Sequence, residues 1–372
     1  MEVVNGAKHT VAEAIMMMDK EGNEFVVVII KATYRIPKDG KMPRPIIPPQ
    51  PIVQADQFTG EPGLSAVIYE ADYVLRKPLC DVLFHARAHT PDNYPKQSVT
   101  VTVQVASMTK TLKVYGPGTW QSGPTGLVAQ RQPFVTSLPL TYDHALGGAH
   151  AWDDNDPTRI ETHRINPVGV GYATKAKRKL ADTPTPCIEA LDRPITAPDS
   201  KAVPQALSAL PRNSALRVCY AGTYDETWRQ EVFPFLPEDF DERYCQSSPA
   251  DQQIPYPQGG ESVYLANLMA GRTEVRFNLP RFDNIPIRVL KHNHDVLEVQ
   301  PIVDTLFFEP DEQRFSVVWR GVIPLVRKIR EIETIAIGPV CKEWWANKLT
   351  GSGCGSCNGN RDQDEAEAGV AA

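Results

Sequence analysis

Many short segments of the chain alternate apolar and polar residues with a period of two, which is the pattern of a half-buried β-strand. From Val99 to Val105, valines alternate with Thr or Gln, so one face of an extended segment would be apolar and the other polar. Phe25 to Ile30 is instead a continuous apolar run that passes into alternation up to Ile36. It predicts a strand that is buried on both faces before one face meets solvent. Cys80 to Ala88 predicts a further strand.

The C-terminal third has the most regular pattern. It contains six successive strand-like segments: Val263 to Leu268, Thr273 to Leu279, Ile285 to Leu290, Val296 to Val299, Thr305 to Glu309 and Arg314 to Val322. The turn from Pro310 to Gln313 joins the last two into a hairpin, and Val340 to Leu349 predicts a short helix. Strands at this spacing are typical of a sandwich or barrel. We therefore predict a mainly β protein with antiparallel, sandwich-like or barrel-like lobes and little helix.

Composition adds long loops to this picture. Proline accounts for 33 of the 372 residues, about 9% against a usual level of about 5%, and it is excluded from helix interiors and central strands. Long, ordered, proline-rich loops are therefore expected between the strands. We assign an N-terminal β lobe to residues 1–140, a C-terminal β lobe with an irregular aromatic loop to 141–349, and a disordered Gly-rich and acidic tail to 350–372.

The irregular aromatic loop, residues 228–261, carries six aromatic residues among prolines and acidic side chains, and it has neither helical nor strand periodicity. A disordered linker would be poor in aromatics, because large apolar groups left in water favour collapse. Burial of aromatic rings contributes roughly 25 cal/mol per Å². The rings that we expect to be buried are Phe233, Phe235, Phe240 and Tyr244. The sequence thus predicts a folded loop that its own large side chains hold in place.

Several stretches of the chain carry a family resemblance. They are KATYRI at 31–36, LPLTYDHALGGA at 138–149, NPVGVGY at 166–172, FPFLPEDFDERY at 233–244, PADQQ at 249–253, GGE at 259–261 and VDTLFFEPDEQRFSVVWRG at 303–321. Together they resemble domain-of-unknown-function family 2169, whose members lie in bacterial type VI secretion clusters. The resembling stretches are spread over roughly residues 1–335.

The resemblance implies an adaptor or chaperone that loads a toxic effector onto the secretion spike. The implied partners are a secreted effector and a PAAR-like protein at the tip of the spike, and no catalytic residue or cofactor is implied. The motifs single out residues that would be structural or would contact the partner. These are Tyr142, Asp143, His144, Phe233, Phe235, Asp239, Asp241, Arg243, Tyr244, Asp251, Gln252 and Gln253.

The residues leave two other functions open, a metal-dependent hydrolase and a structural component of the secretion apparatus. Asp143 and His144, with His150 and His163, could form an acid–base or metal cluster. Against this, adjacent residues of a strand point to opposite faces, and no HExxH or comparable spacing is present. The acidic run Glu238 to Glu242 could bind a divalent cation, but it lacks the calcium-loop pattern, so pairing with arginines is favoured.

Two further pairs are candidate metal ligands. His292 and His294 lie two apart and would share one face of a strand, a geometry that suits a metal, but no third ligand is identifiable. Cys354 and Cys357 form a single CxxC in the predicted tail. A structural zinc site normally needs a second pair of ligands, so we favour free thiols there.

Charge and hydropathy restrict the partners further. A net charge of −6 argues against nucleic-acid binding, which requires clustered Lys and Arg. No segment approaches the run of about 18 apolar residues that a spanning helix needs, and the N-terminus has no signal-peptide pattern. We therefore expect a cytoplasmic protein that contacts neither nucleic acid nor membrane. The seven dispersed cysteines fit a reducing compartment.

Overall fold

The computed structural model describes residues 1–350 apart from residues 39–40, 92–93, 125, 134–136, 154, 176–179, 283–284 and 327–328. The tail assigned from residue 350 lies outside the described residues from 351 onwards, and so do Cys354 and Cys357. Within the described part the chain is mainly β, with several antiparallel sheets and no closed barrel, which confirms the predicted class.

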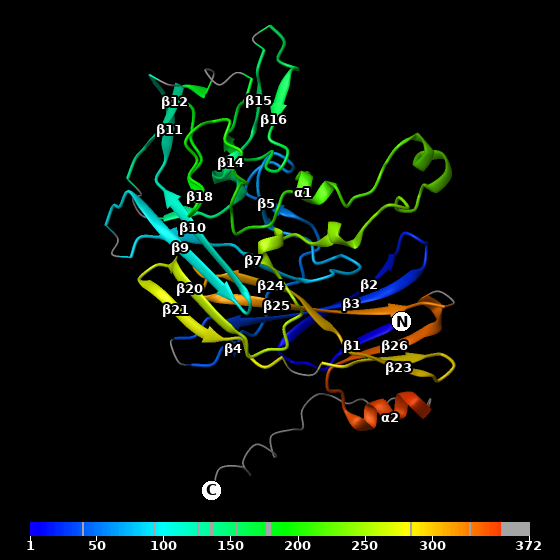
Figure 1. The fold of residues 1–372 in the computed structure, drawn as a ribbon. Helices are drawn as coiled ribbons and strands as arrows, with labels where there is room; N and C mark the ends of the chain where they lie inside the picture. The colour runs from blue at the N-terminus through cyan, green and yellow to red at the C-terminus, as the bar shows by residue number, and fades with distance from the viewer. Residues whose placement is uncertain are drawn as a thin grey trace.

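The centre of the molecule is a seven-stranded sheet, which we call the main sheet (Figure 1). Its strands follow the order β19 (Gln253–Ile254), β7 (Cys80–Phe84), β24 (Ile302–Glu309), β25 (Arg314–Pro324), β3 (Glu24–Arg35) and β2 (Thr10–Met18), with β4 (Arg44–Pro45) paired to β3. β7 and β24 are parallel, and the other pairs are antiparallel. The apolar run predicted as a strand buried on both faces is β3, and the predicted C-terminal hairpin is β24–β25.

Two smaller sheets pack against one face of the main sheet. One has the order β18 (Ile188–Ala190), β10 (Met108–Tyr115), β9 (Ser98–Val105), β20 (Ser262–Met269) and β21 (Arg272–Asn278). The other has the order β1 (Glu2–Asn5), β26 (Ile332–Ile337), β22 (Ile287–Lys291) and β23 (Val296–Val299). A single apolar cluster joins all three sheets, with Val28 of β3, Val103 of β9 and Val289 of β22 among its fully buried members. The alternating valines of β9 thus face the core as predicted.

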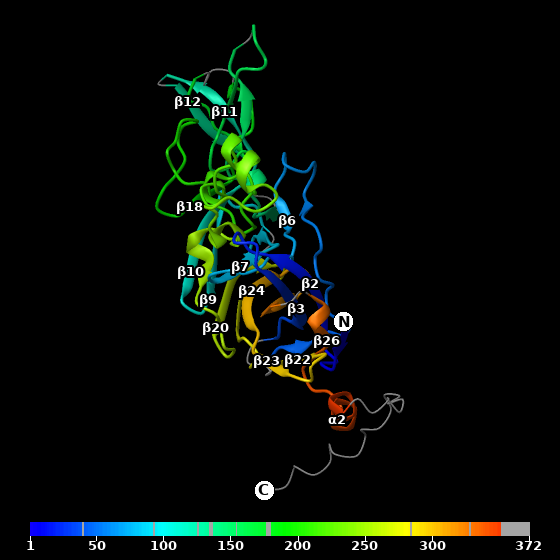
Figure 2. The same ribbon diagram turned by 90° about the vertical axis from the view of Figure 1, so that its right-hand side faces the viewer.

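Other strands of the described part form short pairs, of which β11 (Gly118–Gly123) and β12 (Gly126–Arg131) lie far from α2 (Lys342–Thr350), as Figure 2 shows. The pairs are β5 (Gln57–Phe58) with β6 (Val67–Tyr69), β8 (Arg87–His89) with β13 (Ser137–Pro139), β11 with β12, β14 (Leu146–Gly147) with β17 (Val170–Gly171), and β15 (Ala149–Ala151) with β16 (Ile160–Thr162). The helical turns of the described residues are η1 (Tyr142–His144), α1 (Ala215–Val218), η3 (Trp228–Val232), η4 (Glu242–Cys245), η5 (Ala250–Gln252) and η6 (Ile329–Glu331).

Two details differ from the sequence-based expectation. The segment Cys80–Ala88 is not one strand, because β7 ends at Phe84 within the main sheet and β8 pairs with β13 outside it. A division of the chain at residue 140 would separate strands that are hydrogen-bonded to each other, since β7 pairs with β24 and β3 pairs with β25 in the main sheet.

Candidate functional site

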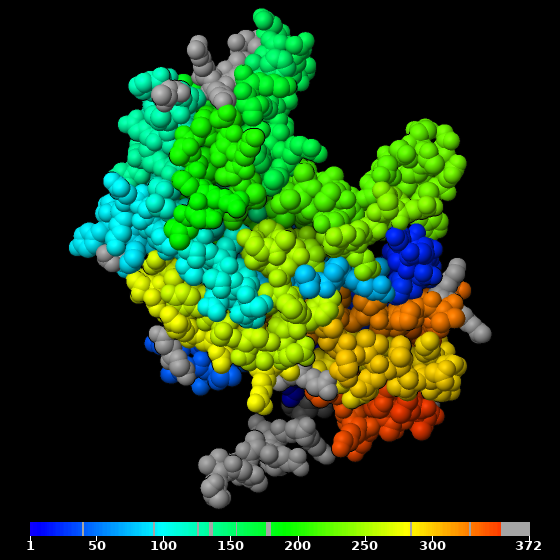
Figure 3. Space-filling view, in the orientation of Figure 1, coloured from blue at the N-terminus to red at the C-terminus, as the bar shows by residue number. Residues whose placement is uncertain are grey.

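The aromatic loop, together with the residues that lead into it, contains an exposed arm and a buried anchor. We call residues 221–240 the arm and residues 246–254 the anchor. Figures 1 and 3 show the arm leaving the body of the protein beside the turn that joins β2 to β3. Most side chains of the arm are exposed, whereas Gln246–Pro249 are buried. The sequence motif that looked continuous therefore has two parts with different surroundings.

The arm is closed at its base by polar contacts. Asp241 donates its backbone N–H to the carbonyl oxygen of Tyr220 at 3.0 Å. The carboxylate of Asp239 accepts hydrogen bonds from the N–H and the hydroxyl of Thr223, both at 2.8 Å. Lys20, in the β2–β3 turn, donates to the carbonyl oxygen of Glu238 at 2.9 Å. These contacts hold the two ends of the arm together and fix them beside the main sheet.

Trp228 organises the interior of the arm. Its ring meets Tyr224 edge-on at a centroid distance of 4.7 Å and Phe233 at 5.7 Å. Its indole N–H donates to the carbonyl oxygen of Phe235 at 3.0 Å, and its backbone N–H donates to the carboxylate of Asp225 at 2.8 Å. The arm therefore has a small aromatic cluster of its own and a defined shape.

The expected burial of Phe233 and Phe235 is wrong. Tyr224, Phe233 and Phe235 are 54%, 65% and 43% exposed. Phe240 and Tyr244, nearer the base, are half-buried. The reason is that the arm projects from the body, and the ring of Phe235 lies against Gly22 in the β2–β3 turn.

Phe235→Ala is accordingly expected to lower the free energy of unfolding by less than about 1 kcal/mol, because partly exposed side chains contribute little to stability. Phe308→Ala is the matched control, since Phe308 is fully buried in the main sheet and its loss should cost about 3–5 kcal/mol. Urea unfolding of the two variants measures both values. Equal losses would mean that the Phe235 ring is part of the core.

A groove of about 650 Å³ lies between the base of the arm and the end of β2. Its apolar lining comes from Met17 and Met18 at the end of β2, from Leu75, and from Leu236, Phe240 and Tyr244 of the loop. Arg76 and Glu242, which also line the groove, form an ion pair at 3.4 Å. Further charged side chains, namely Asp19, Lys20, Glu21, Arg212 and Asp241, also line the groove. A groove of this size with mixed apolar and charged walls has room for side chains of a bound protein segment.

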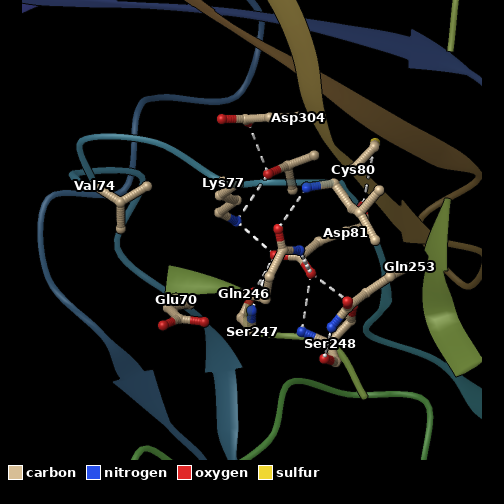
Figure 4. A network of polar contacts seen from close by, with 12 residues as sticks. Glu70, Val74, Lys77, Cys80, Asp81, Gln246, Ser247, Ser248, Gln253 and Asp304 are labelled. Atoms are coloured by element: carbon tan, nitrogen blue, oxygen red, sulfur yellow. Dashed lines mark hydrogen bonds and ion pairs between the residues drawn. The ribbon is translucent and has the colours of Figure 1, made fainter. Parts of the chain in front are cut away.

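The anchor is built around a buried carboxylate that the sequence analysis missed. Asp81 of β7 is fully buried, and it accepts hydrogen bonds from the Lys77 ammonium at 2.8 Å and the Gln246 amide at 2.7 Å (Figure 4). It also accepts from the N–H and the hydroxyl of both Ser247 and Ser248, at distances between 2.6 and 3.1 Å. Both carboxylate oxygens are thus occupied by donors from the anchor and from Lys77.

The charges of this pair are held in place by each other. Burial alone would raise the pKa of Asp81, but the Lys77 ammonium and the hydrogen bonds lower it below its usual range. Burial likewise opposes the charge of Lys77, and the carboxylate of Asp81 raises its pKa. Because Asp81 is fully buried and Lys77 is only 6% exposed, the arrangement has the character of a structural tie and not of an acid–base site.

The motif residues 251–253, which belong to the anchor, connect it to β10. Lys110 of β10 donates to the carboxylate of Asp251 at 3.2 Å and to the amide oxygen of Gln252 at 2.8 Å. Gln252, fully buried, donates to the carbonyl oxygens of Val82 at 2.8 Å and Leu207 at 3.1 Å. Gln253 lies in β19, opposite Asp81 in β7. These three residues therefore connect two sheets to the segment around residue 207.

A second buried tie holds the base of the arm. Arg217 of α1 is 1% exposed and donates to the carboxylate of Glu70 at 2.7 Å and to the carbonyl oxygen of Tyr244 at 3.0 Å. Nearer solvent, Arg243 forms an ion pair with Asp241 at 2.6 Å and lies over the ring of Tyr220 at 4.2 Å. The hydrogen bonds from Arg243 lower the pKa of Asp241. Part of the acidic run of the loop therefore forms ion pairs with arginine, which is the interpretation that the sequence favoured over a cation site.

Tyr142, Asp143 and His144 lie together in η1, but they face different partners. Tyr142 is buried, and burial raises the pKa of its phenol. Asp143 accepts hydrogen bonds from the Thr59 hydroxyl at 2.6 Å and the Ala66 N–H at 2.8 Å. Burial lowers the pKa of His144. The residues of this motif hold η1 against the β5–β6 segment.

The histidines named as a possible hydrolase cluster are engaged separately. His150 pairs with Glu161 at 3.7 Å, and His163 accepts a hydrogen bond from the Asn166 N–H at 3.1 Å. Within the described ranges, no group of three or more His, Cys, Asp or Glu side chains is arranged to hold a metal ion. The geometry thus offers no point at which these side chains converge.

His292 and His294 do not share a strand face, which corrects the expectation. β22 ends at Lys291, and both histidines lie exposed in the turn before β23. His294 has a φ of 66°, a left-handed conformation that breaks the alternation of a strand. His292 lies 3.9 Å from the carboxylate of Glu333.

Comparison with known proteins identifies the family. A family model described as "Uncharacterized protein conserved in bacteria (DUF2169)" matches residues 21–320, which is most of the chain. The chain belongs to domain-of-unknown-function family 2169. The match confirms the resemblance noted in the sequence, and its range contains the arm, the anchor and Asp81. No curated protein and no solved structure matches the chain. In the described part of this family member, no helix is long and apolar enough to cross a membrane.

Proposed function

We propose that this chain is a non-enzymatic adaptor of a type VI secretion system, which binds a secreted effector in the cytoplasm and helps to load it onto the PAAR-like spike. The observation that carries the proposal is the exposed aromatic arm beside a groove with both apolar and charged walls. The secretion context of the proposal comes from the resemblance of the sequence motifs to proteins that lie in type VI secretion clusters.

The surface around the arm has the properties of a protein-binding site. The arm itself carries the exposed rings of Tyr224, Phe233 and Phe235, and Met18 at the end of β2, which is 46% exposed, lines the groove beside it. Aromatic residues are favoured at interfaces because they bury a large area and lose little conformational entropy. The two buried ties fix the base of the arm, so less ordering would be required when a partner binds.

Secretion by cells with and without this protein tests the proposal, while the secretion apparatus itself stays intact. Loss of one effector with normal release of the tube protein is the result that we expect for an adaptor. Loss of both would indicate a structural component of the apparatus. Unchanged secretion of every effector, together with no partner that co-purifies, would contradict the adaptor function and favour the hydrolase hypothesis.

A further inference from the structure

β2 is an open edge of the main sheet. It is nine residues long, TVAEAIMMM, and it stands at the end of the strand order with β3 as its neighbour. Among the described residues, the backbone of Val11–Met18 hydrogen-bonds to no strand other than β3. One side of this strand therefore presents a row of unpaired N–H and C=O groups.

The register shows which residues face the open side. Asp19 donates its N–H to the carbonyl oxygen of Asn23, so the odd-numbered residues of β2 are bonded to β3. In agreement, Leu325 donates to the carbonyl oxygen of Glu24, an even-numbered residue of β3 that faces β25. The backbone groups of Ala12, Ala14 and Met16 must then point away from β3. These groups form the free edge.

This edge lacks the protection that the other edges of the three larger sheets have in the described part of the chain. Sheets are usually guarded by short edge strands, by charges or by proline. β1, β23, β18 and β19 have 4, 4, 3 and 2 residues, and β21 presents Arg272, Glu274 and Arg276. β2 has no proline and no lysine, and Glu13, its one charged side chain, is hydrogen-bonded to Tyr73. A long, apolar, unguarded edge is suited to receive another strand.

We infer that an extended, apolar segment of the effector adds to β2 as a further strand of the main sheet. This inference rests on the proposed function and specifies how the partner is held. Backbone hydrogen bonds to Ala12, Ala14 and Met16 would supply affinity, as in other cases of strand addition. Side chains of the same segment would continue from the end of β2 into the groove at Met17 and Met18, below the arm.

A second copy of the chain fits this edge less well than a partner segment. In the symmetric antiparallel register centred on Ala14, Thr10 of the second copy would lie opposite Met18. Thr10 is hydrogen-bonded within the turn at Asn5–Ala7, so the chain there turns back towards β1 and does not continue in the direction of the groove. A segment of another protein can pass the end of β2 in extended form and use both the edge and the groove.

Titration calorimetry with the purified effector encoded beside the gene of this chain tests the inference. Ala14→Pro removes one outward N–H and leaves the bonds to β3 intact, and proline is tolerated on an edge of this kind. Ala14→Ser, which keeps the N–H, is its matched control. Met16→Lys places a charge at a residue that is 51% exposed, so folding is unaffected. Val296→Lys, at a 46% exposed residue of the β23 edge, is the control for the added charge.

We expect Ala14→Pro and Met16→Lys each to weaken effector binding by about tenfold or more, and both controls to bind like the parent protein. Overlapping 15-residue peptides of the effector then locate the segment. The peptide with the highest affinity can then be N-methylated at every second amide, either at the odd or at the even positions. One of these two peptides should lose binding and the other should keep it, because only one set of amides would face β2.

Three results would overturn the inference. Equal binding of the effector by the parent, Ala14→Pro and Met16→Lys proteins would exclude strand addition, while the adaptor function would stand. Self-association of the parent protein that Ala14→Pro abolishes would identify a second copy as the occupant. Absence of effector binding by the parent protein would contradict the adaptor function and the inference together.

Discussion

Asp81→Ala is expected to lower the free energy of unfolding by about 3–5 kcal/mol, because it leaves the ammonium of Lys77 unpaired in the interior. It also removes the acceptor for Gln246, Ser247 and Ser248, whose donors would remain buried without a partner. Since these residues follow directly after the base of the arm, the variant should also loosen the arm relative to the main sheet.

Urea unfolding measures this loss, with Lys77→Met, Asp81→Ala and the double variant Lys77→Met/Asp81→Ala compared. The double variant should be less destabilised than the sum of the two single changes, because it leaves no isolated charge. Arg276→Ala removes an exposed ion pair with Glu274 and serves as the control, with an expected change below about 1 kcal/mol. A loss of that small size for Asp81→Ala would show that the anchor does not depend on the carboxylate.

The strands were largely predictable, and their order was not. Period-two alternation identified β9, and the turn at Pro310–Gln313 identified the β24–β25 hairpin, because both signals are local. The pairing of Asp81 in β7 with Thr305 in β24 joins distant parts of the chain in parallel. Such a pairing depends on packing of whole sheets, and no local pattern encodes it.

The candidate site was predictable only in part. The aromatic composition of the loop correctly indicated an ordered segment, but it could not distinguish rings that pack on the core from rings clustered on an arm, since both remove apolar area from water. Lys77 and Asp81 were missed, although a signal existed. Asp81 is a charged residue within the apolar strand CDVLF, and a charge in such a place requires a buried partner.

Replacement of residues 224–238 by a Gly-Gly link should remove effector binding and leave the fold intact. Thr223 and Asp239 already lie within hydrogen-bonding distance at the base, so a short link can join them without distortion. The change removes Tyr224, Phe233 and Phe235 together, and loss of several aromatic anchors is expected to weaken binding about 100-fold or more. The melting temperature should change by only a few degrees, since the arm contributes little to the core.

One experiment tests the role of the arm: the titration of the purified effector into the parent protein and into the arm-replaced variant, with thermal unfolding of both followed by circular dichroism. We expect saturable binding by the parent protein, no detectable binding by the variant at the same concentrations, and similar unfolding curves. Equal affinity of the two proteins for the effector would mean that the exposed arm has no part in holding the partner, and the proposed binding site would be wrong.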